Sequence, residues 1–184
     1  MSNDNKIHLV SGEAYYAAVH VPDQSYNIYK VDVVVDRETK TKLEGLGLKP
    51  LPAPKKSEKD YNDYDKLKSD GLVFRFKRKA VFSDNTVNKP PLVVDASTKP
   101  MTDIIGNGSK VKVRFSLFNY TNHGGGTTAI LKAIQVLDLV EYVPVGSSEG
   151  GFQVEEGFVS KTKVVVEPTK VETKDSDNLD KVDF

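Results

Sequence analysis

The sequence predicts an all-β protein built as a small barrel or sandwich, and three observations lead to this prediction. Several short segments are rich in Val, Ile, Tyr and Phe and alternate apolar with polar residues, as half-buried strands do. Clusters of Gly, Pro, Asn and Asp separate these segments and are typical of turns. A single segment carries the signals of a helix, so short strands joined by turns dominate the pattern.

The first predicted elements are two strands and the helix. Residues 13–20 and 28–35 are rich in Tyr and Val, and the sequence VPDQSYN between them supplies turn residues. Asp36 can accept hydrogen bonds at the start of a helix over residues 37–44, and the glycines that follow would end it.

A polar stretch and a basic strand come next. Residues 49–70 hold three prolines and many charges, so we expect an exposed loop. Its Tyr61 and Tyr64 are expected to face solvent, with stacking on bases as the alternative. Residues 72–82 alternate as a strand does, with Arg78 out of pattern. One face of this strand would carry Leu72, Phe74, Phe76, Ala80 and Phe82, and the other Val73, Arg75, Lys77, Lys79 and Val81.

Three more strands complete the predicted sheet. Residues 92–96 follow two prolines, which suits an edge strand. Residues 110–118 alternate cleanly between apolar and basic side chains. Residues 129–142 fit a helix or a strand by period alone, and their β-branched content together with the preceding glycine turn favours a strand.

Cations gather on the outer faces of the two clearest strands. The chain has 26 basic and 26 acidic residues, yet residues 75–114 carry nine Lys or Arg against three Asp or Glu. If both faces meet in one groove, they suit a polyanion, because successive phosphates are neutralised and counterions are released. Exposed rings beside them are surfaces on which unpaired bases stack. The predicted binding residues are Arg75, Lys77, Lys79, Lys110, Lys112, Arg114, Phe118 and Tyr120.

A plainer interpretation stays open, because Lys and Arg on the outside of a strand also solvate a sheet and protect its edges. Other chemistry has little support. The three histidines lack metal-ligand spacing, the chain has no Cys, and the GNGSK sequence lacks the spacing of a phosphate-binding loop. We therefore expect a protein that is not an enzyme and uses neither a metal nor a cofactor. We also expect no signal peptide and no membrane span.

The composition divides the chain into three parts. Residues 1–145 can form the folded domain, residues 146–166 a satellite segment, and residues 167–184 a disordered acidic tail. The tail carries six Asp or Glu and three Lys and ends in Phe184. An acidic strip can occupy a basic groove in place of nucleic acid, and a terminal aromatic residue can enter a partner's pocket.

The segments IYKVDVVV, FRFKRKAVF, PPLVVDA and IIGNGSKVKVRFSLFNY, and an acidic end closing in Asp-Phe, occur in the order seen in one family. The chain resembles the replicative single-stranded DNA-binding protein of short-tailed phages of the T-seven type. The resemblance covers about residues 13–142 and returns at the tail. It implies an OB-fold, a five-stranded Greek-key barrel, that coats single strands during phage replication, recombination and repair in the cytoplasm of the infected host cell.

The resemblance also implies partners. The protein would form a homodimer, and its tail would contact the phage DNA polymerase and helicase-primase and compete for the DNA groove. These tail roles fall on Asp177, Asp180, Asp183 and Phe184. This tail is shorter than the tail of the phage family and contains three lysines, so its negative electrostatic field is expected to be weaker than that of the family's tail. Two alternatives remain: an RNA-binding OB module, and a virion structural or assembly protein whose basic sheet binds an acidic protein.

Overall fold

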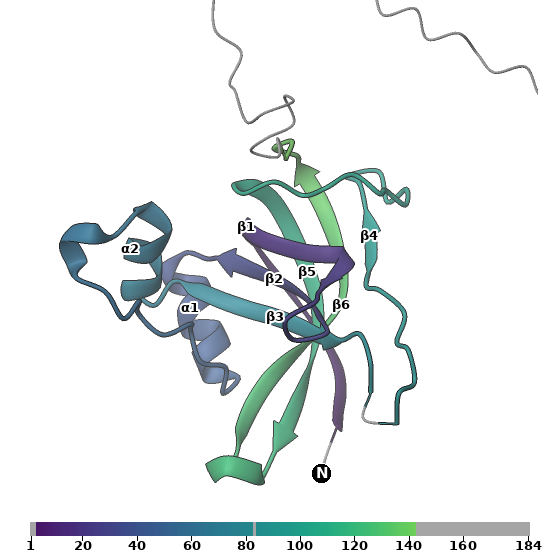
Figure 1. Cartoon of the computed structure of the whole chain (residues 1–184), viewed down its shortest axis with the longest axis horizontal. Coiled ribbons are helices and arrows are strands. Elements are labelled where there is room, and N and C mark those ends of the chain that lie inside the picture. Colours follow the sequence, from purple (N-terminus) through teal and green to yellow (C-terminus); the bar gives the residue numbers. More distant parts are fainter. Residues whose placement is uncertain (1–2, 83, 143–184) are drawn as a thin grey trace, which may run out of the picture. The chain divides into compact units, whose positions relative to one another are not determined.

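Five strands close into a barrel in the computed structural model, which describes residues 3–82 and 84–142 (Figure 1). The hydrogen-bonded order is β3-β2-β1-β5-β6. A parallel bridge between Lys77 and Ile130 joins the first strand of this order, β3, to the last, β6, and closes the barrel. This order and closure are those of an OB-fold, so the predicted fold class is confirmed. The barrel strands are β1 (Asn3–Asp23), β2 (Ile28–Val34), β3 (Val73–Lys79), β5 (Ser109–Tyr120) and β6 (Gly126–Asp138).

The barrel interior is filled by the apolar half of each alternating strand. On β5, Val111, Val113 and Phe115 are fully buried, as the sequence pattern predicts. The rings of Phe76 and Phe115 meet at a centroid distance of 4.9 Å and join the two basic strands through the core. The remaining core residues on the barrel strands include Val10, Ala14, Val19, Val31, Val33, Phe74, Leu117, Ala129, Leu131, Ile134 and Val136.

Strand β1 is longer than the predicted segment 13–20, because it pairs with two neighbours in succession. Its first part, from Asn3 to Ala14, lies along β5, and its second part, from Glu13 to Asp23, lies along β2. Gly12 lies at the crossing, where a Cβ atom would be 2.2 Å from the carbonyl oxygen of Val34. The missing side chain therefore allows the close approach that bends β1 around the barrel.

The predicted helix is present and a second helix was missed. Helix α1 spans Arg37–Gly45, and Asp36 accepts a hydrogen bond of 2.7 Å from the amide of Thr39, as its capping role requires. Within the stretch 49–70, predicted as a loop, a 3-10 turn η1 (Glu58–Asp60) precedes helix α2 (Asp63–Ser69). Its start carries a capping box between Asn62 and Asp65, a signal present in the sequence.

Outside the closed barrel, the short strand β4 (Leu92–Val94) lies at the edge of the sheet, parallel to β6, as the preceding prolines suggest. The ambiguous segment beginning at residue 129 is part of β6 and is a strand. A 3-10 turn η2 (Asn122–Gly124) caps the hairpin between β5 and β6. No helix among the described residues is long and apolar enough to cross a membrane.

Candidate nucleic-acid interface

An open groove of about 1170 Å³ lies at the end of β3, between the β1–β2 turn and the β5–β6 hairpin. A single residue pair joins β3 to β6, so the hairpin forms one bank of the groove and β3 the other. The groove is larger than the roughly 300–1,000 Å³ of a small-molecule pocket, which suits an extended ligand. It is lined by Tyr26, Ile28, Arg75, Lys77, Arg78, Lys79, Phe82, Asn88, Ser116, Leu117, Phe118, Tyr120, Thr127, Thr128, Ile130 and Lys132.

The groove is positively charged, because its described lining has no carboxylate and includes, besides Arg75 at its border, the four basic residues Lys77, Arg78, Lys79 and Lys132. Lys77, Lys79 and Lys132 are exposed and form no ion pair with any described residue. By contrast Lys30, which lies opposite Lys77 on β2, is already paired with Asp23. The three unpaired ammonium groups are therefore available to an external anion.

Two of the basic residues were not predicted as binding residues. Arg78 donates a hydrogen bond of 2.7 Å to the side-chain oxygen of Asn88, which holds its guanidinium at the groove. Lys132 interrupts the apolar run AILKAIQVL, and this interruption is the signal that could have revealed it. A register shift in the β5–β6 pairing falls next to it, and its side chain is exposed at the groove.

Aromatic rings stand beside the cations. Phe118 is half-buried and Tyr120 is 38% exposed, both on the hairpin, while Tyr26 in the β1–β2 turn is 72% exposed. Tyr120 lies opposite Gly126, and a Cβ atom at Gly126 would be only 2.7 Å from the Tyr120 hydroxyl. The Tyr120 ring therefore lies across the position that a side chain at residue 126 would take.

Phe82 also lines the groove, although the sequence pattern placed it on the same strand face as Phe74 and Phe76, which are buried. Its side chain is 44% exposed. Strand β3 ends at Lys79, and the chain then turns, with the Phe82 amide bonded to the carbonyl of Thr86. The alternation of faces does not continue through this turn, and the prediction for Phe82 was wrong.

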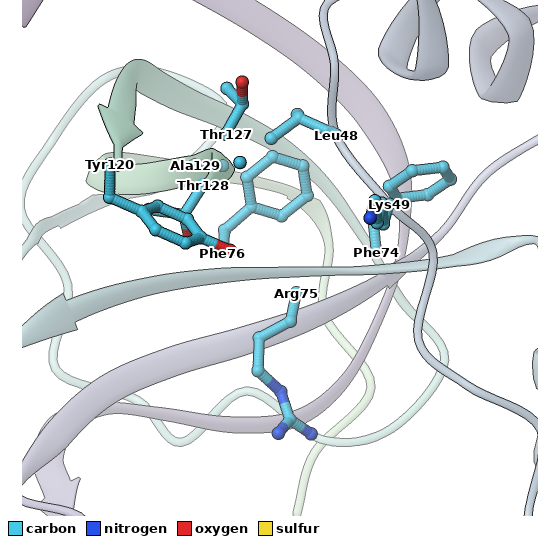
Figure 2. Close-up of a pocket in the computed structure, with 10 residues that line it drawn as sticks. Leu48, Lys49, Phe74, Arg75, Phe76, Tyr120, Thr127, Thr128 and Ala129 are labelled. Atoms are coloured by element: carbon cyan, nitrogen blue, oxygen red, sulfur yellow. The ribbon is translucent and has the colours of Figure 1, made fainter. Parts of the chain in front are cut away.

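Arg75 was predicted to contact phosphate, but its guanidinium is engaged elsewhere. It binds the carboxylate of Asp32 through two hydrogen bonds of 2.6 and 2.8 Å, and the hydroxyl of Tyr64 donates a third bond of 2.7 Å. Asp32 is only 1% exposed. Figure 2 shows the Arg75 side chain on the opposite side of β3 from Phe76 and Tyr120. Arg75 therefore borders the groove without pointing its charge into it.

The contacts of Asp32 also explain the pKa shifts of Tyr64 and Arg75 and the wrong prediction for Tyr64. Burial, followed by the hydrogen bond to Asp32, raises the pKa of Tyr64 far above its ordinary value of 10.0, and the same carboxylate raises the pKa of Arg75. Tyr64 also stacks on Tyr15 at a centroid distance of 5.1 Å. The expectation that Tyr64 faces solvent was wrong, because this ring attaches helix α2 to the barrel wall.

The cations of β5 lie apart from those of β3. Lys110 is 3.6 Å from Asp138, Lys112 lies between Ser11 and Gln135, and Arg114 lies between Leu9 and Ala133. None of the three cations lines the groove. In the closed barrel, β6 lies between β3 and β5. Outward side chains of β3 and β5 at the same height along the barrel axis therefore point in different directions.

The structure thus brings together four of the eight predicted binding residues with free access to the groove: Lys77, Lys79, Phe118 and Tyr120. It adds Arg78, Lys132, Tyr26 and Phe82 from other positions. The predicted tail residues Asp177, Asp180, Asp183 and Phe184 lie outside the described residues. The groove occupies the face over the second and third strands, between the loops that OB-folds use to bind oligonucleotides.

Comparison with known proteins supports the sequence resemblance. No protein-family model matches the chain, and no curated protein sequence matches it. Among solved structures, it is similar to gp2.5, a single-stranded DNA-binding protein encoded by bacteriophage T7, at 26% identity and a TM-score of 0.51, over 84% of this chain and 98% of that chain. The resemblance to the single-stranded DNA-binding proteins of T-seven-type phages is thereby confirmed.

Two structures from bacteriophage Enc34 are more distant. The C-terminally truncated single-stranded DNA-binding protein matches at 16% identity and a TM-score of 0.49, over 75% of this chain and 89% of that chain. The Enc34 protein without truncation matches at 14% identity and a TM-score of 0.49, over 82% of this chain and 88% of that chain.

Proposed function

We propose that this chain is a non-enzymatic single-stranded DNA-binding protein that coats unpaired DNA during phage replication and recombination. The observation that carries the proposal is the groove, where unpaired cations and exposed rings share one surface whose described lining has no carboxylate. Its position on the barrel and the similarity to gp2.5 support the same function. An unpaired strand offers both features that the groove can bind, a row of phosphates and exposed base faces.

In this proposal the cations bind phosphates and the rings bind bases. The bound DNA crosses the seam between β3 and β6. Along its path one phosphate each is neutralised by Lys77 and Lys79 on β3 and by Lys132 on β6. With about three to five phosphates neutralised, log K should fall with log salt at a slope of about −2 to −3.5. Phe118 and Tyr120 stack on bases, each contributing about 1–3 kcal/mol.

The other predicted cations receive different roles. Arg75 positions β3 through Asp32 and leaves the phosphates to its neighbours. Lys110, Lys112 and Arg114 lie further along β5, outside the groove, where we propose that they contact nucleotides that flank the bound segment. Their contribution should be smaller, and that of Lys110 smallest, because Asp138 partly neutralises it.

The tail and the oligomeric state belong to the same proposal. We propose that Asp177, Asp180, Asp183 and Phe184 contact the phage DNA polymerase and helicase-primase, that the tail competes weakly for the groove, and that the protein is a homodimer. The acidic composition of residues 167–184 and the resemblance of the chain end to the phage family support these roles.

A titration with oligo-dT followed by tyrosine fluorescence tests the proposed function. Tyr26 and Tyr120 line the groove, so DNA binding should quench the emission. Combining Lys77→Ala with Lys79→Ala should make the salt slope shallower by about 1.4, whereas Lys59→Ala, an exposed lysine away from the groove, should change nothing. Absence of quenching, or binding that does not respond to salt, would reject the proposal and favour the virion-protein alternative.

The same titration separates DNA from RNA. Phosphate contacts and stacking serve either polymer, so the comparison must use competition between oligonucleotides of matched length and sequence. A clear preference for the ribo-oligonucleotide would reassign the groove to RNA.

A further inference from the structure

The first part of strand β1 has a hydrogen-bonding edge that the described chain leaves open. From Asn3 to Gly12 this strand pairs with β5 on one side, and pairing with β2 on the other side begins only at Glu13. None of the backbone hydrogen bonds that the described turns and loops form reaches residues 3–12. An open edge presents a row of N–H and C=O groups on which another strand can pair.

This edge has little of the protection that natural sheets give to open edges. Charged residues, proline and bulges usually prevent a strand from pairing with another chain. The register shift between Asp4 and Ile7 is such a bulge, but residues 7–12, IHLVSG, contain no proline, lysine, arginine or carboxylate. On their outer face Ile7 is 41% exposed and Leu9 is 65% exposed. The edge is therefore both unprotected and apolar.

The core holds the open edge in place. On the inner face Val10 is buried, and the ring of His8 stacks on Phe115 at a centroid distance of 5.3 Å. The ladder with β5 continues without a register shift from Ile7 to Ala14. An incoming strand would meet a preformed template, so pairing requires little further ordering.

The opposite end of the sheet, at β4, is covered instead. Val94 forms a bridge with Pro100, and the amide of Met101 donates a hydrogen bond of 3.1 Å to the carbonyl of Val93. An open edge that matches β1 in length and composition is therefore offered by β1 of a second copy of the chain.

We propose that two copies of the chain pair through the open edges of β1, an inference that rests on the homodimer in the proposed function. Related by a two-fold axis, the two strands run antiparallel, and each satisfies the edge of the other. In the registers centred on His8 or Leu9, Leu9 lies opposite the partner's Ile7 or the partner's Leu9. The Cβ atoms of directly opposite residues are about 4.5–5.5 Å apart, so pairing buries the exposed leucines.

A charge swap at Leu9 tests the inference by sedimentation equilibrium of the full-length protein. Wild type should sediment as a dimer, at twice the chain mass of 20.3 kDa. Leu9→Lys and Leu9→Asp should each raise the Kd of the dimer about 100-fold, because two leucines lose their burial and like charges meet. An equimolar mixture of the two variants should form dimers again, because opposite charges then meet across the interface.

Three controls accompany the swap. Leu92→Lys makes the same change at an exposed leucine of β4, whose edge is covered, and should stay dimeric. Among residues 7–12, the amides that point to the open edge should exchange slowly with solvent in the wild-type dimer and fast in Leu9→Lys. Both Leu9 variants should bind a short oligo-dT like wild type, because Leu9 lies outside the groove.

The outcomes separate the inference from the function. If Leu9→Lys dimerises as tightly as wild type, or if the mixture of variants stays monomeric, β1 is not the interface. A monomeric wild type with slow exchange at these amides would mean that a segment of the same chain covers the edge, and it would overturn the inference. A monomeric wild type with fast exchange would overturn it together with the proposed homodimer. Failure of wild type to bind oligo-dT would reject DNA binding and leave the interface standing.

Discussion

Replacing Arg75 with Ala tests whether two neighbouring outward cations on β3 have different roles. Arg75 is assigned to the ion pair with Asp32, and Lys77 to a phosphate of the bound DNA. The change removes both hydrogen bonds to Asp32 and leaves a carboxylate that is 1% exposed with the Tyr64 hydroxyl as its remaining side-chain partner. The same substitution at Lys77 removes an exposed side chain with no partner among the described residues. One variant should therefore lose stability, and the other should lose affinity.

The magnitudes follow from burial. Breaking a fully buried ion pair costs about 3–5 kcal/mol. The Arg75 side chain is 36% exposed, so water already screens part of the interaction, and we expect a loss of about 2–4 kcal/mol in the free energy of unfolding. Lys77→Ala should change that free energy by less than about 0.5 kcal/mol. It should weaken DNA binding about five-fold at 0.1 M salt and make the salt slope about 0.7 shallower.

Two measurements on each variant decide the question. Urea unfolding gives the free energy of unfolding, and oligo-dT titration at two salt concentrations, under conditions where each variant is folded, gives the slope. Arg75→Ala should keep the wild-type slope. If it stays as stable as wild type and loses slope as Lys77→Ala does, then Arg75 contacts phosphate and the assignment drawn from the Asp32 pair is wrong.

Three further predictions concern other parts of the chain. Gly126→Ala should displace the Tyr120 ring and weaken DNA binding, whereas Gly45→Ala, with nothing within 4 Å of the new Cβ, should bind like wild type in the same titration. Raising the pH above 10 should destabilise the fold, because Tyr64 then ionises in the unfolded chain before it does in the folded protein; Tyr64→Phe should lose part of this dependence in urea unfolding at pH 8 and 10.5. Deleting residues 167–184 should abolish polymerase binding in a pull-down and tighten DNA binding or leave it unchanged; loss of DNA binding would contradict the proposed role of the tail.

The sequence predicted the elements that local patterns determine. The alternation through Val111, Val113 and Phe115 placed β5 and its buried face correctly, and the side chain of Asp36 marked the start of α1. These signals depend on neighbours in the chain, so periodicity and capping chemistry reveal them. Helix α2 was missed because the polar composition of its segment outweighed the capping box at Asn62.

The parts of the interface that the sequence could not reveal depend on distant pairings. Arg75 reads as a free cation until the fold brings Asp32, 43 positions away, within 2.6 Å. Arg114 shares its pattern with Lys77, but the order of strands around the barrel points the two in different directions.

Strands β3 and β6 are joined by one bridge, between Lys77 and Ile130, so this seam has the fewest backbone pairs of the barrel wall. Few backbone hydrogen bonds hold this seam, so we expect its amides to exchange with solvent sooner than those in the β1–β5 ladder. A single-stranded DNA segment bound to the cations of both β3 and β6 would link the two sides of this seam. At a ligand concentration of 100 Kd such binding would add about 2.7 kcal/mol to the stability of the folded protein, and bound DNA would support the seam that has the fewest backbone pairs.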